Sequence, residues 1–143
     1  MSPEGDLSED SIRIMMDTRN PPYESGTIST NTRDTEFNNE RLSTFPRLQI
    51  LTIRQISREG SPPRHPVTIS DGRYQARGLL SPNLNHLIND GIIHENCIIT
   101  VNEYFAHAST QFGATIIIIL DCDVVESHQH RIGNPLPIYW YRP

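Results

Sequence analysis

The sequence predicts a mainly β protein, a small five-stranded barrel formed by residues 46–138, with one short helix before it and another inside it. Two observations indicate this fold class. Short runs rich in β-branched and apolar residues alternate with Pro, Gly, Asn and Asp, which favour turns. Only residues 7–16 and 82–89 combine helical apolar spacing with start or stop signals of a helix.

Charge and hydrophobicity are unevenly distributed along the 143 residues. The hydrophobic content of 36% is low for a chain folded throughout. Residues 1–45 carry nine acids and four arginines, whereas residues 46–143 carry eight of each, so the net charge of −5 belongs to the N-terminal third. We therefore expect an N-terminal capping helix (1–17), a disordered acidic insertion (18–45), the barrel (46–138) and a tail (139–143).

The first helix is expected within residues 7–16. Ser8 is a candidate N-cap, and Leu7 before it can contact Ile12 as a hydrophobic staple. Ile12, Met15 and Met16 share one face at helical spacing. Because so short a helix is marginal alone, we expect it to dock on another part of the protein.

The barrel follows in chain order. Five strands are predicted, at residues 48–56, 67–70, 73–80, 97–105 and 115–125. Asp71-Gly72 forms the turn between the second and third strands. Ser81 as N-cap and Pro82 at the first helical position begin the second helix, which ends at Asp90-Gly91. Three strands, a helix and two strands is the order of an OB-fold, a five-stranded Greek-key barrel.

The fifth strand contains an uninterrupted isoleucine run, which predicts that its first half is covered on both sides. Simple alternation places one set of its side chains on a single face: Ile116, Ile118, Leu120, Cys122 and Val124. The two cysteines, Cys97 and Cys122, are interpreted as reduced thiols of the core.

Six short motifs and the first helix resemble one known family. The motifs are Leu48-Gln49-Ile50, Ile53-Arg54, Ser61-Pro62-Pro63-Arg64, Ser70-Asp71-Gly72, Asn96-Cys97 and Ile132-Gly133-Asn134-Pro135-Leu136-Pro137. Their order and spacing resemble those of the N-terminal OB domain of the replication protein A large subunit. The resemblance covers residues 5–16 and 46–138.

The resemblance implies a nuclear, non-enzymatic module that recruits proteins of DNA replication, repair and checkpoint signalling. In that family the barrel cleft takes acidic amphipathic helices and binds single-stranded DNA weakly. It implies basic cleft positions at Arg54 and Arg64, an apolar lining from Leu80, Ile116 and Ile118, and a polar contact from His107. Other replication protein A subunits are further expected partners if the chain is part of a larger one.

The chain departs from the family at several basic positions. Pro66 and Glu103 stand where the family has basic residues, and the hairpin from Ser109 to Thr115, which includes Ala114, has no positive charge. Each lost surface charge is expected to weaken association by about 0.2–1 kcal/mol.

Two alternatives remain open. The barrel could bind single-stranded DNA directly, with stacking by Tyr139, Trp140 and Tyr141, although these aromatics could instead pack on the barrel. Alternatively, the chain is a diverged copy whose own acidic segment Asp34–Leu42 occupies the cleft. A nucleic-acid binder that ignores sequence normally carries a basic face, which a neutral barrel lacks.

The sequence favours neither an enzyme nor a cofactor-binding protein. It has no Gly-rich phosphate loop, zinc motif or catalytic triad pattern. His128 and His130 have no third metal ligand nearby, and Asp121 and Asp123 have no evident nucleophile. No apolar run is long enough to span a membrane, so no membrane partner is expected.

Overall fold

The computed structural model describes residues 7–17, 45–109 and 113–138. Two predicted regions lie outside these residues. They are the predicted tail and, apart from Phe45, the predicted insertion, which includes segment Asp34–Leu42. The elements in chain order are α1 (Ser11–Met15), β1 (Arg47–Ile53), β2 (His65–Ser70), β3 (Tyr74–Leu80), a 3₁₀ turn (Pro82–Leu84), α3 (Asn85–Asn89), β4 (Ile98–Ser109), β5 (Ala114–Glu126) and β6 (Leu136–Pro137).

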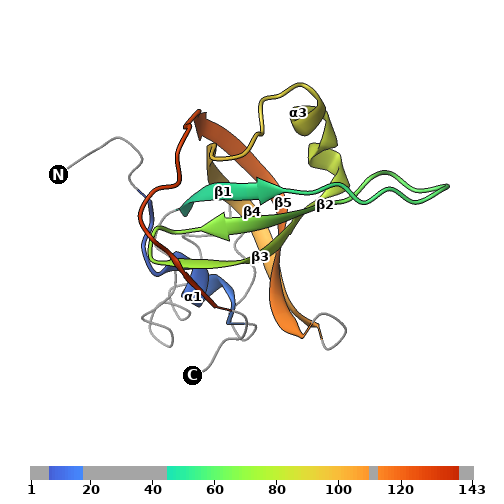
Figure 1. Ribbon diagram of the computed structural model, residues 1–143. Helices are drawn as coiled ribbons and strands as arrows, with labels where there is room; N and C mark the ends of the chain where they lie inside the picture. The colour runs from blue at the N-terminus through green and yellow to red at the C-terminus, as the bar shows by residue number, and fades with distance from the viewer. Residues whose placement is uncertain (1–6, 18–44, 110–112, 139–143) are drawn as a thin grey trace, which may run out of the picture.

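The strands close into a barrel (Figure 1). β2 pairs antiparallel with both β1 and β3, β3 pairs parallel with β5, and β5 pairs antiparallel with β4, which returns to β1. This connectivity and the helical segment between β3 and β4 confirm the predicted OB-fold. β6 was not predicted; it adds a short parallel pairing beside Tyr74 and Gln75.

The core fills the inside of the barrel. Side chains facing inward from every barrel strand are buried, among them Leu48, Ile50, Ile69, Leu80, Ile99 and Ile117. Ile12 and Met15 of α1 and Met16, which follows the helix, are completely buried, which confirms the predicted apolar face. α1 packs against β3.

The start of α1 differs from the prediction. Asp10, with φ of 72°, precedes the helix, and the Ser8 hydroxyl is not its cap. Instead, Ser8 Oγ accepts a hydrogen bond of 2.9 Å from the Arg47 backbone N–H. Ser8 therefore ties the segment before the helix to the start of β1.

The simple alternation predicted for β5 is wrong beyond Ile119. Ile117 and Ile119 are fully buried, and the next buried residue is Cys122, three positions later. The pairing of β4 with β5 shifts register on both sides of Glu103, so the faces of both strands exchange there. Ile116 and Ile118 consequently face outward, while Cys122 faces the core.

Cys97 and Cys122 are free and buried, as predicted. Burial raises the pKa of the Cys97 thiol, and burial together with nearby Asp121 raises the pKa of Cys122 to about 12. Both thiols are therefore protonated at neutral pH and are poor nucleophiles.

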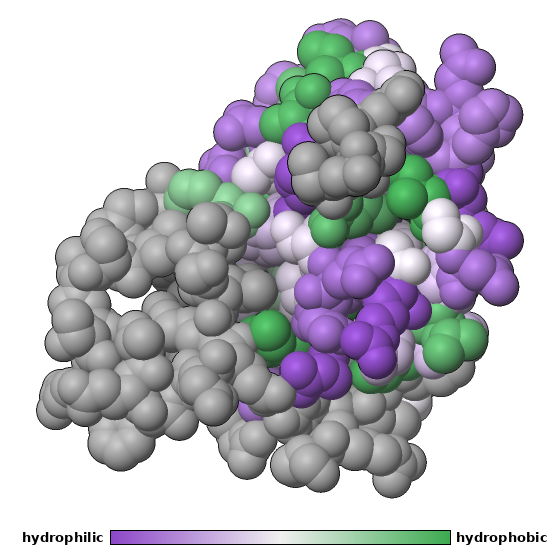
Figure 2. Space-filling model, turned by 90° about the vertical axis from the view of Figure 1, so that its left-hand side faces the viewer, coloured by the Kyte–Doolittle hydropathy of each residue, from purple (hydrophilic) through white to green (hydrophobic). Residues whose placement is uncertain are grey.

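The surface of the described residues has a mixed character. Figure 2 shows one face on which apolar residues form several small patches between hydrophilic ones. No helix among the described residues has both the length and the apolar character needed to cross a bilayer. Within the same residues, no group of three or more His, Cys, Asp or Glu side chains is placed to hold a metal ion.

Candidate binding groove

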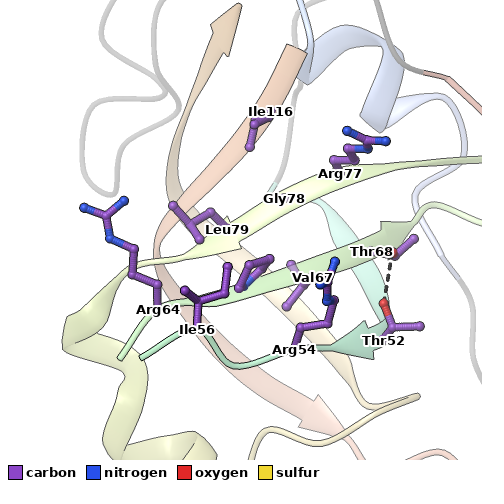
Figure 3. Close-up of a pocket in the computed structure, with 11 residues that line it drawn as sticks. Thr52, Arg54, Ile56, Arg64, Val67, Thr68, Arg77, Gly78, Leu79 and Ile116 are labelled. Carbon is purple, nitrogen blue, oxygen red and sulfur yellow. Dashed lines mark hydrogen bonds between the residues drawn. The ribbon is translucent and has the colours of Figure 1, made fainter. Parts of the chain in front are cut away.

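A groove with a volume of about 370 Å³ lies on the outside of the barrel, across β1, β2 and β3 and reaching β5 (Figure 3). Eleven residues line it: Thr52, Arg54, Ile56, Arg64, Pro66, Val67, Thr68, Arg77, Gly78, Leu79 and Ile116. Apolar side chains and backbone form much of the lining, and three arginines stand around it.

Alternation along β3 explains which of its residues reach the groove. Ala76, Gly78 and Leu80 are buried, so Arg77 and Leu79 point outward. A Cβ on Gly78 would lie 3.1 Å from both the Ile117 carbonyl oxygen and Val67 Cγ2. Glycine at this position therefore allows β3 to approach β5 and close the barrel beneath the groove.

The strand register arranges the outward side chains in two rows across the sheet. In the first row Thr52 pairs with Thr68, and Thr68 pairs with Arg77. Their two hydroxyl oxygens are 3.0 Å apart. On the next two strands, Ile116 pairs with His107. Because Gly78 pairs with Ile117, Ile116 lies at the level of Arg77 and continues the row.

The second row runs parallel to the first. The Arg54 backbone N–H donates to the Pro66 carbonyl at 2.9 Å, and Pro66 pairs with Leu79. Leu79 pairs with Ile118, and Ile118 pairs with Phe105. Because paired residues share a face, this row leads from a cation just after β1 to apolar side chains on β5 and β4.

Arg64 reaches the groove from the arm between β1 and β2, which extends away from the barrel (Figure 1). Two backbone hydrogen bonds, of 2.8 and 2.9 Å, join Ile56 and Arg64 across this arm. They place Ile56, whose apolar side chain is 43% exposed, beside Arg64. The arm therefore adds one apolar and one basic group to the rim.

The electrostatics of the groove favour an anionic ligand. Arg54, Arg64 and Arg77 are all exposed, and none of the described lining residues is acidic. Arg54 and Arg64 make no ion pair with the described part of the chain. Their guanidinium groups can bind carboxylate or phosphate oxygens with two parallel hydrogen bonds.

The structure brings together part of the set of site residues expected from the sequence. Arg54, Arg64 and Ile116 line the groove, and Ile118 and His107 lie on the same outward face at its edge. Leu80 has no exposed surface, which corrects the expectation that it lines the cleft. Its neighbour Leu79 takes that place, because successive residues of a strand face opposite sides.

Arg77 and Leu79 are two of the groove residues that were not predicted from the sequence. The signal was present in β3, where Ala76, Gly78 and Leu80 form the small or apolar set that faces a core. The remaining outward set contains Arg77 and Leu79.

The positions at which this chain lacks the basic residues of the family lie in different parts of the structure. Pro66 lies in the groove itself, half-buried between its two neighbours in the second row. Ala114 is buried, and Glu103 lies at the register shift opposite Asp121. Outside the described residues lie residues 110–112, between β4 and β5 in the sequence, and the aromatics Tyr139, Trp140 and Tyr141.

Comparison with known proteins agrees with the family resemblance of the sequence. Residues 7–127 match the family described as replication factor-A protein 1, N-terminal domain. The replication protein A 70 kDa DNA-binding subunit of Mus musculus is 28% identical over 116 residues, which cover 78% of this chain and 18% of that protein. The subunit of Gallus gallus is 31% identical over 96 residues, covering 64% of this chain and 16% of that protein.

A further relative is similar to a comparable share of the chain. Replication factor A protein 1 of Schizosaccharomyces pombe is 26% identical over 105 residues, covering 69% of this chain and 17% of that protein. The chain thus spans less than a fifth of the length of these relatives. Because the family match covers most of the sequence, the chain belongs to the family of N-terminal domains of replication factor A protein 1.

Proposed function

We propose that this chain is a non-enzymatic interaction module of DNA replication and repair, acting in the nucleus. Its groove would bind acidic amphipathic helices of replication, repair and checkpoint proteins. The observation that carries the proposal is the placement of Arg54, Arg64 and Arg77 around an apolar floor, with no acidic side chain among the described lining residues.

The arrangement suits an amphipathic helix better than a purely charged ligand. Ile56, Leu79 and Ile116 offer apolar contacts to one face of a helix, and the arginines surrounding them can bind carboxylates on its flanks. Apolar contact supplies affinity, while rim charges mainly steer encounter and select the partner.

Direct binding of single-stranded DNA is the second candidate, because the relatives are DNA-binding subunits. Single-strand sites on OB-folds combine basic grooves with aromatic side chains on which bases stack. The described lining of the groove contains no aromatic residue, and Phe105 lies only at its edge. This composition favours the peptide over the nucleic acid.

A fluorescence-polarisation titration with a labelled acidic amphipathic peptide tests the proposal. We expect Arg54→Glu to weaken binding by about five-fold or more, since it removes one favourable charge contact and introduces a repulsive one. Arg131→Glu is the matched control, because Arg131 is also exposed but lies outside the groove lining. Equal affinity of the Arg54 variant and the control would refute the proposed site.

The same titration with an oligothymidine tests the second candidate function, direct binding of single-stranded DNA. A nucleic-acid site would lose affinity steeply with salt, in proportion to the number of phosphates contacted. If the oligothymidine binds more tightly than the peptide at low salt and Arg54→Glu abolishes that binding, the single-strand function replaces the peptide function.

A further inference from the structure

The outward face around the groove is divided into two chemically different halves. The basic half consists of Arg54, Arg64 and Arg77. Arg54 directly follows β1, Arg64 directly precedes β2, and Arg77 lies on β3. The apolar half consists of Phe105, Ile116 and Ile118 on β4 and β5. His107, which pairs with Ile116, is the one polar residue that the two rows contribute to the apolar half.

The segment that joins β4 to β5 carries no positive charge either. No Lys or Arg occurs in the sequence from Ser109 to Thr115. The apolar half is also accessible: Phe105 is 36% exposed, and Ile116 and Ile118 are half-buried. A ligand that crosses the whole face therefore passes from a cationic surface to an uncharged one.

The distance over which this change occurs is set by strand spacing. Neighbouring strands lie about 4.8 Å apart, so β4 is about 10 Å from β3 across β5. A helix advances about 10 Å in roughly two turns. Carboxylates two turns beyond those that meet the arginines would lose hydration against apolar side chains and find no cationic partner.

We infer that the groove selects amphipathic helices whose acidic residues are confined to one end, with an apolar, uncharged segment about two turns further along. This inference rests on the proposed function and specifies the partner of the same groove. Charge complementarity within the two rows assigns the acidic end to the β1–β3 side and the apolar end to the β5–β4 side.

Two peptides of equal length test the inference. One peptide, called one-ended, has acidic residues in its first half and neutral glutamines in its second half. The other, called two-ended, has glutamates in place of those glutamines. Both keep the same apolar residues and are made in both sequence directions. We expect the wild-type chain to bind the two-ended peptide no more tightly than the one-ended peptide.

The decisive variant is His107→Arg, which places a cation in the apolar half without changing a residue of the groove floor. It should increase the affinity for the two-ended peptide about two- to five-fold relative to the one-ended peptide. Gln129→Arg is the control, since Gln129 is exposed on the segment after β5 and should leave the ratio unchanged. The ratio of the affinities for the two peptides is compared between each variant and the wild type. This comparison cancels differences in helix propensity between the peptides.

Phe105→Ser provides a second readout at the apolar half. It should weaken both peptides, by up to about ten-fold, with an unaltered melting temperature as the check on folding. Tighter binding of the two-ended peptide by the wild type, or an unchanged ratio in His107→Arg, would overturn the inference. Absence of binding by either peptide would instead refute the proposed function.

Discussion

The β2–β3 turn and the groove both involve β2 and β3, but their charged side chains are used in different ways. At the turn, Asp71 is completely buried, and its carboxylate accepts three backbone hydrogen bonds, from Ile12 at 3.0 Å, Arg73 at 2.8 Å and Tyr74 at 2.7 Å. In the groove, Arg54 and Arg64 are exposed and make no ion pair within the described residues.

A second buried polar group resembles Asp71 rather than the arginines. The Gln49 amide nitrogen donates to the Asn96 and His130 carbonyls at 3.0 and 2.7 Å, and its oxygen accepts from the Ile132 N–H at 2.8 Å. Gln49 thereby attaches the segment after β5 to β1, as Asp71 attaches α1 to the turn. Both residues hold separate parts of the chain together.

The difference shows how structural and ligand-binding polar residues can be separated in one small barrel. Burying a polar group is costly unless it is hydrogen-bonded, so Asp71 and Gln49 have their partners within the chain. Arg54 and Arg64 remain hydrated and can exchange water for a ligand. The following substitutions should therefore change stability at the turn and leave it unchanged in the groove.

The largest effect is expected from Asp71→Ala. It leaves three backbone N–H groups without their acceptor, including the Ile12 N–H that docks α1, and should lower the free energy of unfolding by about 3 kcal/mol. Urea denaturation followed by circular dichroism measures the loss. Asp90→Ala, at an exposed aspartate, should stay within about 0.5 kcal/mol of wild type. Equal stability of the two variants would contradict the structural role of Asp71.

A smaller effect should appear in the pH dependence of stability. Burial raises the pKa of Asp71 in the folded protein above its usual value of 3.8, against the opposing influence of its three backbone hydrogen bonds. Just above pH 3.8 the folded state therefore holds a proton that the unfolded chain has lost. The contribution of Asp71 to stability consequently falls as pH rises through this window and is level above the folded-state pKa.

Comparison of wild type with Asp71→Asn isolates this titration, since the other ionisable groups are common to both proteins. The difference in unfolding free energy, wild type minus variant, should be greatest below pH 3.8 and decrease as the pH is raised. Urea denaturation in steps from pH 3 to 7 measures it, and a difference that increases with pH would show that the folded-state pKa is lowered instead.

The smallest change in stability is expected from Arg54→Glu, the variant that should lose peptide affinity. Because this side chain is exposed and makes no ion pair with the described residues, its unfolding free energy should remain within about 0.5 kcal/mol of wild type. This stability is measured by thermal and urea unfolding of the same preparation that is used for the peptide titration. A loss of several kcal/mol would mean that Arg54 supports the fold, and the contrast with Asp71 would no longer hold.

Several residues of the motifs that carried the family resemblance have structural roles. Gln49, Asp71 and Asn96 form hydrogen bonds between distant segments. Gly133, with φ of 73°, approaches Gly72 so closely that a Cβ would lie 2.8 Å from the Gly72 carbonyl oxygen. These motifs consequently predicted the fold better than they predicted the groove.

Local pattern determined the barrel strands, the helix after Ser81-Pro82 and the buried face of α1, because alternation, turn residues and helical spacing are properties of neighbouring residues. Tertiary structure decided what depends on register. The shifts beside Glu103 exchanged the faces of β4 and β5, the pairing of β3 put Leu79 and Arg77 in the groove, and closure of the barrel gathered three separate arginines there. A shift of one residue reverses the face of every side chain that follows, and short-range pattern does not specify where such shifts occur.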